Sequence, residues 1–225
     1  MTKMTMTTYE EPNYYLAQQY AYKTIFEAGI TTLPINFKKI EKFFQNLKIH
    51  SFSWMARTHN MSFDDVCKWA RSNEGCCWYR KSDDTYIILY NEKIGTPQRI
   101  RWTIAHELGH FVLKHNLRSN EKVMSRGPLN EADYEIFEKE ANYFAKNILV
   151  PIPVIAKILT SISTINLFDI AEICDISHEA AEHTISYLNR IQHRGLSIDS
   201  VYPEVAIAFQ DYIENLTLEL KHYAF

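Results

Sequence analysis

The sequence lacks the cysteine patterns that hold small extracellular domains together or bind a structural zinc ion. Its four cysteines include one adjacent pair and no Cys-x-x-Cys motif; they are Cys67, Cys76, Cys77 and Cys174. Neither a disulfide framework nor a thiolate zinc site is indicated. Reduced thiols in the protein core are the simpler interpretation.

The chain also lacks a strong charge of either sign and a long hydrophobic run. A net charge of -3 gives no electrostatic footprint for a protein that binds nucleic acid over its whole surface. The N-terminus MTKMTMTTYEE has no apolar stretch typical of a signal peptide, and the most apolar run, NILVPIPVIAKIL, is interrupted by proline and lysine. We therefore expect a cytoplasmic protein that does not cross a membrane.

Helical periodicity dominates a sequence whose composition is that of a soluble globular protein, with 46% hydrophobic and 23% charged residues. Helices are predicted after Pro12, from Asn36 through residue 47, from Ser62, from Thr96 to about His115, and over residues 130–149. The runs CCWYR and TYIILY, separated by KSDD, predict an antiparallel hairpin. These elements indicate an α+β fold, with a mostly helical core and a small antiparallel sheet.

The chain beyond residue 153 stays helical in pattern. We predict a core over residues 1–153 and a helical C-terminal region over 154–225, in which about 166–192 resembles a helix-turn-helix with Ser177 capping its second helix. That second helix has acidic residues and histidines but no Arg or Lys before Arg190, which makes it a poor surface for phosphates. We do not expect direct nucleic-acid binding, and favour packing or partner docking.

The stretch RIRWTIAHELGHFVLKH, residues 99–115, contains a His-Glu-x-x-His motif. On a helix, His106 and His110 lie on one face and can present two imidazole nitrogens to one metal ion. Glu107 lies beside that pair, where a carboxylate that is not a ligand can take a proton from water activated by the ion. The motif alone arises by chance in roughly a few per cent of chains of this composition. However, apolar residues on two stripes predict a buried helix, in which these polar groups need partners.

A catalytic zinc ion usually has three protein ligands, so a third should come from another element. On the helix predicted from residue 131, Glu138 and Asn142 lie together on one flank of the buried face, while Glu140 points to the other side. Glu138 is therefore the better third ligand and Glu140 the alternative, and Asn142 could steady a ligand by a hydrogen bond. The simpler interpretation makes both glutamates solvated. His115, Tyr143 and Tyr134 are candidates for stabilising an oxyanion, although each also fits a surface or core role.

The sequence resembles the ImmA/IrrE family of zinc metallo-endopeptidases in four segments: LPINFKKIEKFF, YIILYN, RIRWTIAHELGHFVLKH and EKEANYFAKNILVP. They follow the family's order and cover residues 14–153 or so. The resemblance implies a zincin-like core with one zinc ion per chain, held by His106, His110 and Glu138, and with Glu107 as the catalytic base.

The resemblance also implies a substrate, because members of known role cleave helix-turn-helix transcriptional repressors of mobile elements or stress regulons in bacteria. We therefore expect a zinc-dependent endopeptidase acting on such a repressor. The alternatives are a regulatory module that docks a repressor or DNA without cutting it, and a toxin-like protease acting on a host protein. Manganese or iron could also occupy a site of this kind, although two imidazoles and one carboxylate suit zinc well.

Overall fold

The computed structural model describes residues 11–124, 131–162, 165–194 and 202–222. Its helices are α1 (Tyr14–Glu27), α2 (Phe37–Phe43), α3 (Phe52–His59), α4 (Phe63–Ala70), α5 (Pro97–Val112), α6 (His115–Ser119), α7 (Glu131–Leu149), α8 (Ile152–Ser161), α9 (Leu167–Cys174), α10 (His178–His193), α11 (Pro203–Ala208) and α12 (Gln210–His222). The strands are β1 (Leu47–Ser51), β2 (Gly75–Arg80), β3 (Thr85–Tyr90) and β4 (Val123–Met124). The predicted α+β class is confirmed.

The four strands form one sheet in the order β1-β3-β2-β4. The predicted hairpin is present, since β2 and β3 pair antiparallel, but β1 pairs parallel with β3, with Leu47 opposite Tyr86. The small sheet that was expected to be antiparallel is therefore mixed, with one parallel pair. The cause is at residues 44–47, where the predicted helix does not continue: α2 ends at Phe43 and LKIHS becomes a strand. Helix α3, which follows directly, was not predicted either.

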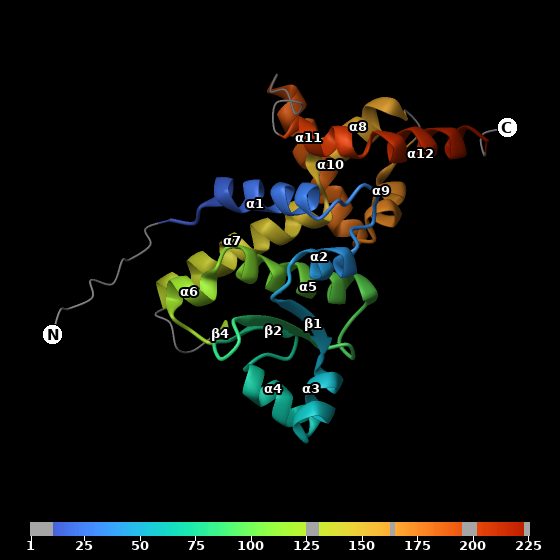
Figure 1. The fold of residues 1–225 in the computed structure, drawn as a ribbon. Helices are drawn as coiled ribbons and strands as arrows, with labels where there is room; N and C mark the ends of the chain where they lie inside the picture. The colour runs from blue at the N-terminus through green and yellow to red at the C-terminus, as the bar shows by residue number, and fades with distance from the viewer. Residues whose placement is uncertain (1–10, 125–130, 163–164, 195–201, 223–225) are drawn as a thin grey trace.

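Helices cover both faces of the sheet, as Figure 1 shows. Strand β3 alternates accordingly: Tyr86 and Ile88 belong to the large core cluster that includes α1, α5 and α7, whereas Ile87 and Leu89 belong to a smaller cluster with α3 and α4. Successive side chains of a strand point to opposite faces, so a strand that is apolar at every position is buried on both sides. The sheet is the middle layer, with α5 on one face and α3 and α4 on the other.

Helices α5 and α7 approach each other unusually closely at Gly109. A Cβ atom added to Gly109 would lie 3.1 Å from the Cα and 3.2 Å from the carbonyl oxygen of Ala141. The buried face of α7 includes Phe137, Ala141, Phe144, Ala145 and Ile148. Small residues at the crossing bring the two backbones together, and this fixes which side chains of the two helices can meet.

The C-terminal helices extend the same hydrophobic core. Ile155, Ile170, Leu188 and Phe209 all belong to the cluster that contains residues of α5 and α7. The two helices predicted around residues 175–177 are present as α9 and α10, and Ser177 caps α10 by accepting a hydrogen bond from Ala180 N–H. The division at residue 153 stays a prediction.

One stretch, residues 131–161, is long and apolar enough to cross a membrane, but 67% of its most apolar window is buried within the fold. It comprises α7 and α8, the central helix of the core and the helix that follows it (Figure 1). Such burial fits a core segment of a soluble protein. A membrane span would instead turn most of its apolar surface outward, toward lipid.

Replacing Gly109 with alanine tests the close crossing of α5 and α7. Alanine favours a helix interior by up to about 1 kcal/mol over glycine, but its Cβ would press on the backbone of Ala141. We expect a net loss of about 1 kcal/mol in the free energy of unfolding, measured by urea denaturation. The variants Asn189→Gly and Asn189→Ala, at an exposed position of α10, differ in stability by the gain in helix propensity alone. An equal gain at Gly109 would show that the crossing has room for a methyl group.

Candidate metal centre

Helix α5 forms for the reasons visible in its sequence and then ends abruptly. The Thr96 hydroxyl caps it by accepting from Arg99 N–H, at the predicted start of the helix, and Pro97 is its first residue. It ends at Val112, three residues earlier than expected, because Lys114 adopts a left-handed conformation with φ 58° and starts the short helix α6. This change of direction carries His115 back toward the end of α5.

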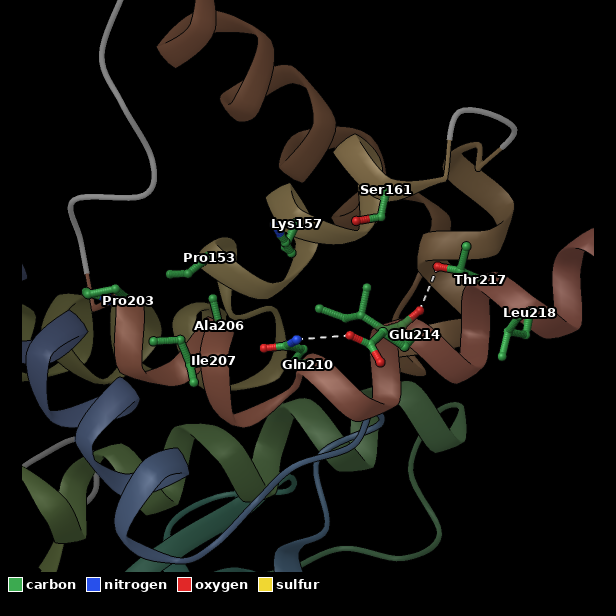
Figure 2. Close-up of a pocket in the computed structure, with 11 residues that line it drawn as sticks. Pro153, Lys157, Ser161, Pro203, Ala206, Ile207, Gln210, Glu214, Thr217 and Leu218 are labelled. Atoms are coloured by element: carbon green, nitrogen blue, oxygen red, sulfur yellow. Dashed lines mark hydrogen bonds between the residues drawn. The ribbon is translucent and has the colours of Figure 1, made fainter.

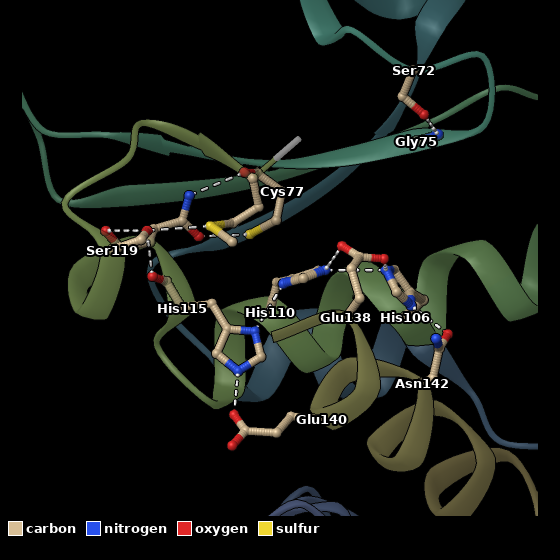
Figure 3. Close-up of polar contacts among 12 residues, drawn as sticks. Ser72, Gly75, Cys77, His106, His110, His115, Ser119, Glu138, Glu140 and Asn142 are labelled. Atoms are coloured by element: carbon tan, nitrogen blue, oxygen red, sulfur yellow. Dashed lines mark hydrogen bonds and ion pairs between the residues drawn. The ribbon is translucent and has the colours of Figure 1, made fainter. Parts of the chain in front are cut away.

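Three side chains from α5 and α7 meet on the side of α5 that faces the sheet (Figure 3). The Nε2 atoms of His106 and His110 lie 3.0 Å apart. Glu138 reaches both: its Oε2 is 3.4 Å from His106 Nε2 and its Oε1 is 3.3 Å from His110 Nε2. The structure thus brings together the three residues predicted as metal ligands, and their ligand atoms lie within 4.8 Å of one another.

The electrostatics of the cluster favour a positive charge between these atoms. Burial raises the pKa of Glu138, but the close polar contacts of its carboxylate with His106 and His110 outweigh this effect and hold that pKa well below its usual range. Burial lowers the pKa of His106, yet the nearby carboxylates outweigh it and the net pKa is raised; for His110 burial prevails and lowers the pKa. Two imidazole nitrogens that both turn lone pairs to one point repel each other unless a proton or a metal cation lies between them.

The donor set fits a divalent transition-metal ion. Ligand atoms placed tetrahedrally at about 2.0–2.1 Å from zinc lie roughly 3.3 Å from one another. In the cluster the two imidazole Nε2 atoms are 3.0 Å apart, and each lies 3.3–3.4 Å from a different oxygen of Glu138. Two imidazoles with one carboxylate also leave a fourth position for water, as in catalytic sites and unlike closed structural sites.

Glu107 lies beside the cluster, and one of its oxygens has no partner. Its side chain is buried, the Cys77 backbone hydrogen-bonds to it, and Oε2 has no hydrogen-bond partner in the structure. Burial raises the pKa of this carboxyl to about 8. Gly75 allows α5 to lie this close to the sheet, because a Cβ atom on residue 75 would lie 2.6 Å from Thr103 Cγ2 and 3.4 Å from Glu107 Cγ. A water molecule or a substrate atom can bind beside an unpaired buried oxygen in a cleft.

The cluster opens into a cleft of about 590 Å³. Helix α7 contributes Tyr134, Glu138 and Asn142, each one turn from the next, and the lining also includes Arg71 and Arg99. Of the three candidates for stabilising an oxyanion, Tyr134 alone lines this cleft. Tyr143 packs against Tyr14 instead, with ring centroids 5.0 Å apart. His115 is fully buried behind His110.

Neighbouring side chains contact the Nδ1 atoms of the two histidines, on the side of each ring away from the cluster. Asn142 Oδ1 is 3.0 Å from His106 Nδ1, so Asn142 contacts one of the proposed ligands. His110 Nδ1 is 2.8 Å from His115 Nδ1, and His115 Nε2 is 2.9 Å from Glu140 Oε2. Burial lowers the pKa of His115 to about 3, so this ring is neutral.

Glu140, the alternative third ligand, does not lie at the cluster. It is 1% exposed and accepts hydrogen bonds from His115, Arg118 and the backbone N–H of Asn13. Sequence reasoning missed this arrangement. The available signal was the presence of His115 and Arg118 just beyond the motif, since a buried carboxylate needs cationic or N–H partners.

A second hollow of about 700 Å³ lies between α8, α11 and α12, away from the cluster (Figure 2). Its lining is mostly apolar and includes the charged residues Lys157 and Glu214. Within the described part of the chain, no histidine or cysteine lines it. Size alone does not make a reaction site. The smaller cleft is the candidate site because the convergent polar groups lie there.

Comparison with protein families gives a match for the IrrE N-terminal-like domain, of peptidase family M78. The match covers residues 69–186, from the end of α4 through α5 and α7 into α10, and therefore includes every residue of the cluster. Comparison with curated proteins gives no match.

The metal-free protein should lose stability with rising pH on account of Glu107. Its pKa is 4.5 in the unfolded chain and about 8 in the fold, so between these values the folded state binds more protons and stability falls as pH rises. We expect Glu107→Gln, which carries no charge, to exceed the chelator-treated wild type in the free energy of unfolding by about 4–5 kcal/mol at pH 9 and by less at pH 5. The free energy of unfolding in urea measures this. Exposed Glu135→Gln is the control, and an equal pH dependence of Glu107→Gln and wild type would contradict the prediction.

Proposed function

The chain belongs to the IrrE N-terminal-like family of metallopeptidases, and on that premise we propose that it is a zinc-dependent endopeptidase. His106, His110 and Glu138 would hold one zinc ion per chain, and Glu107 would be the catalytic base. The observation that carries the proposal is the convergence of three ligand atoms beside a buried carboxylate with one unpaired oxygen. Two imidazoles and one carboxylate are a ligand set that suits zinc.

The side chains have distinct tasks in peptide-bond hydrolysis. Zinc, when bound, supplies Lewis-acid activation of water and of the scissile carbonyl. Glu107 takes the proton from the attacking water and passes it to the nitrogen of the leaving amine. Burial alone raises the pKa of Glu107 to about 8, and a cation held by the three ligands would lower it, so that the carboxylate form would be available at neutral pH.

Tyr134 is our candidate for stabilising the oxyanion. It lies one helical turn before Glu138 and lines the same cleft, so its phenol is on the side of α7 that faces the substrate. A phenolic O–H donates one hydrogen bond and remains neutral at physiological pH, as stabilising a developing oxyanion requires. Neither His115 nor Tyr143 lines the cleft.

The substrate we propose is a protein, namely a helix-turn-helix repressor of a mobile element or stress regulon in the bacterial cytoplasm. Family resemblance supports this choice. The cleft is open to solvent and its lining includes arginine and glutamate side chains, which suits a polypeptide more than a small apolar molecule.

Metal content tests the ligand set. Purified protein supplied with zinc should hold about one ion per chain, and His110→Ala and Glu138→Ala should each lose it, because two remaining ligands bind zinc weakly. Exposed His183→Ala and Glu135→Ala are matched controls that should keep the metal. If the folded wild-type protein held no metal, the motif would be part of an ordinary helix face.

Cleavage tests the role of Glu107. Candidate substrates are small helix-turn-helix proteins encoded beside this gene, incubated with the enzyme and followed by gel electrophoresis and mass spectrometry. Glu107→Gln should retain zinc and lose at least 10²–10⁴-fold in cleavage rate, the usual contribution of a general base. Full cleavage by this variant would refute the mechanism. Inactivation of the repressor without any cleavage, equally by wild type and variant, would support the docking module instead.

A further inference from the structure

A buried row of polar groups lies behind His110, on the side opposite the proposed metal (Figure 3). His110 Nδ1 is 2.8 Å from His115 Nδ1, and His115 Nε2 is 2.9 Å from Glu140 Oε2. His115 is 0% exposed, and Glu140 and His110 are each 1% exposed. Water therefore has little access to these groups, and each must satisfy its hydrogen bonds within the row or with its protein neighbours.

The chemistry of these groups determines the direction of each hydrogen bond. The ionised carboxylate of Glu140 only accepts, so His115 Nε2 must carry a proton and donate it. A neutral His115 then has a lone pair on Nδ1, and His110 Nδ1 must donate to it. The remaining nitrogen of His110, Nε2, is left without a proton and turns its lone pair toward His106 and Glu138.

Glu140 is itself held in place, so the row has a fixed end. Its Oε1 accepts from the backbone N–H of Asn13 at 2.8 Å, and its Oε2 accepts from Arg118 at 2.6 Å as well as from His115. The His115 ring stacks on Phe137, with centroids 4.7 Å apart. Neither the carboxylate nor the ring can turn without losing a buried hydrogen bond or a packing contact.

We propose that His115, anchored by Glu140, is a positioning residue that fixes the tautomer and ring orientation of His110, so that the Nε2 lone pair faces the metal position. This inference deepens the proposed function and rests on it for its metal-binding consequence. A neutral imidazole without such a partner can carry its proton on either nitrogen, and a proton on Nε2 blocks metal binding. His106 is held differently, by the amide of Asn142, whose side chain offers both a donor and an acceptor.

Two replacements of His115 separate shape from hydrogen bonding. His115→Phe keeps a ring for stacking on Phe137 but removes the acceptor for His110 and the donor for Glu140. His115→Gln loses the ring but supplies one carbonyl acceptor and one N–H donor. We expect zinc affinity, measured by competition with a chromophoric chelator, to fall 10–100-fold in His115→Phe, and to stay within about 5-fold of wild type in His115→Gln.

A second measurement follows the tautomer itself and needs no metal. Long-range ¹H–¹⁵N correlation spectra of the chelator-treated, histidine-labelled protein distinguish Nδ1–H from Nε2–H imidazoles. We expect the Nδ1–H form for His110 in wild type and His115→Gln, and a mixture in His115→Phe. Glu140→Gln should also give a mixture, because an amide can donate as well as accept and no longer imposes a direction; this variant tests the inference if His115→Phe does not fold.

Asn147→Ala is the matched control, since it removes another buried polar group of α7, hydrogen-bonded to Tyr22 and Gln18. It should lower stability while changing neither the zinc affinity nor the His110 tautomer. The inference is overturned if His110 is in the Nε2–H form in wild type, or if His115→Phe keeps the wild-type tautomer and affinity. A wild type that binds no zinc but shows the expected tautomers would refute the proposed function and leave the positioning role standing.

Discussion

The distance between helices α5 and α7 is the constraint on which the site depends. At Gly109 the backbone of α7 comes so close that a single added carbon would lie 3.1 Å from the Cα of Ala141. Glu138 is one turn before that contact on α7, and His106 and His110 flank it on α5. A glutamate side chain is short, so its two oxygens reach both imidazoles at 3.3–3.4 Å only because the two backbones are this close. The packing at Gly109 therefore determines the geometry of the proposed ligands.

The same packing creates an electrostatic problem that a cation solves. The fold buries Glu107 and His110, and half-buries His106 and Glu138, within one cleft. Burial alone opposes the carboxylate form of Glu107 and the charged form of His110, as the shifts in their pKa values show. Groups that destabilise a fold when charged are retained where their chemistry is needed. A divalent ion between the ligand atoms would offset the repulsion of the imidazole lone pairs and stabilise the adjacent carboxylate.

The parts of this architecture that could be predicted from sequence are those set by local patterns. Caps such as Thr96 and Ser177 mark helix starts, and the helical wheel of α7 correctly separated Glu138 from Glu140. Strand β1 could not be predicted in this way, because its five residues alternate weakly and its pairing with β3 joins residues about forty positions apart. The anchoring of Glu140 by Asn13 was equally hidden, since it spans 127 positions and involves a backbone N–H that every residue but proline possesses.

Helical geometry also explains how α7 can serve both sides of the proposed metal position. Residues two apart on a helix point in nearly opposite directions, so Glu138 faces the cleft while Glu140 faces the interior behind α5. For Glu140 to act on the cluster, an intermediary must reach it from the end of α5. The left-handed turn at Lys114 supplies one, because it ends the helix and brings His115 back against His110. Two glutamates that look redundant in the sequence thus have separate positions, one at the proposed ligand atoms and the other in contact with His115, which contacts His110.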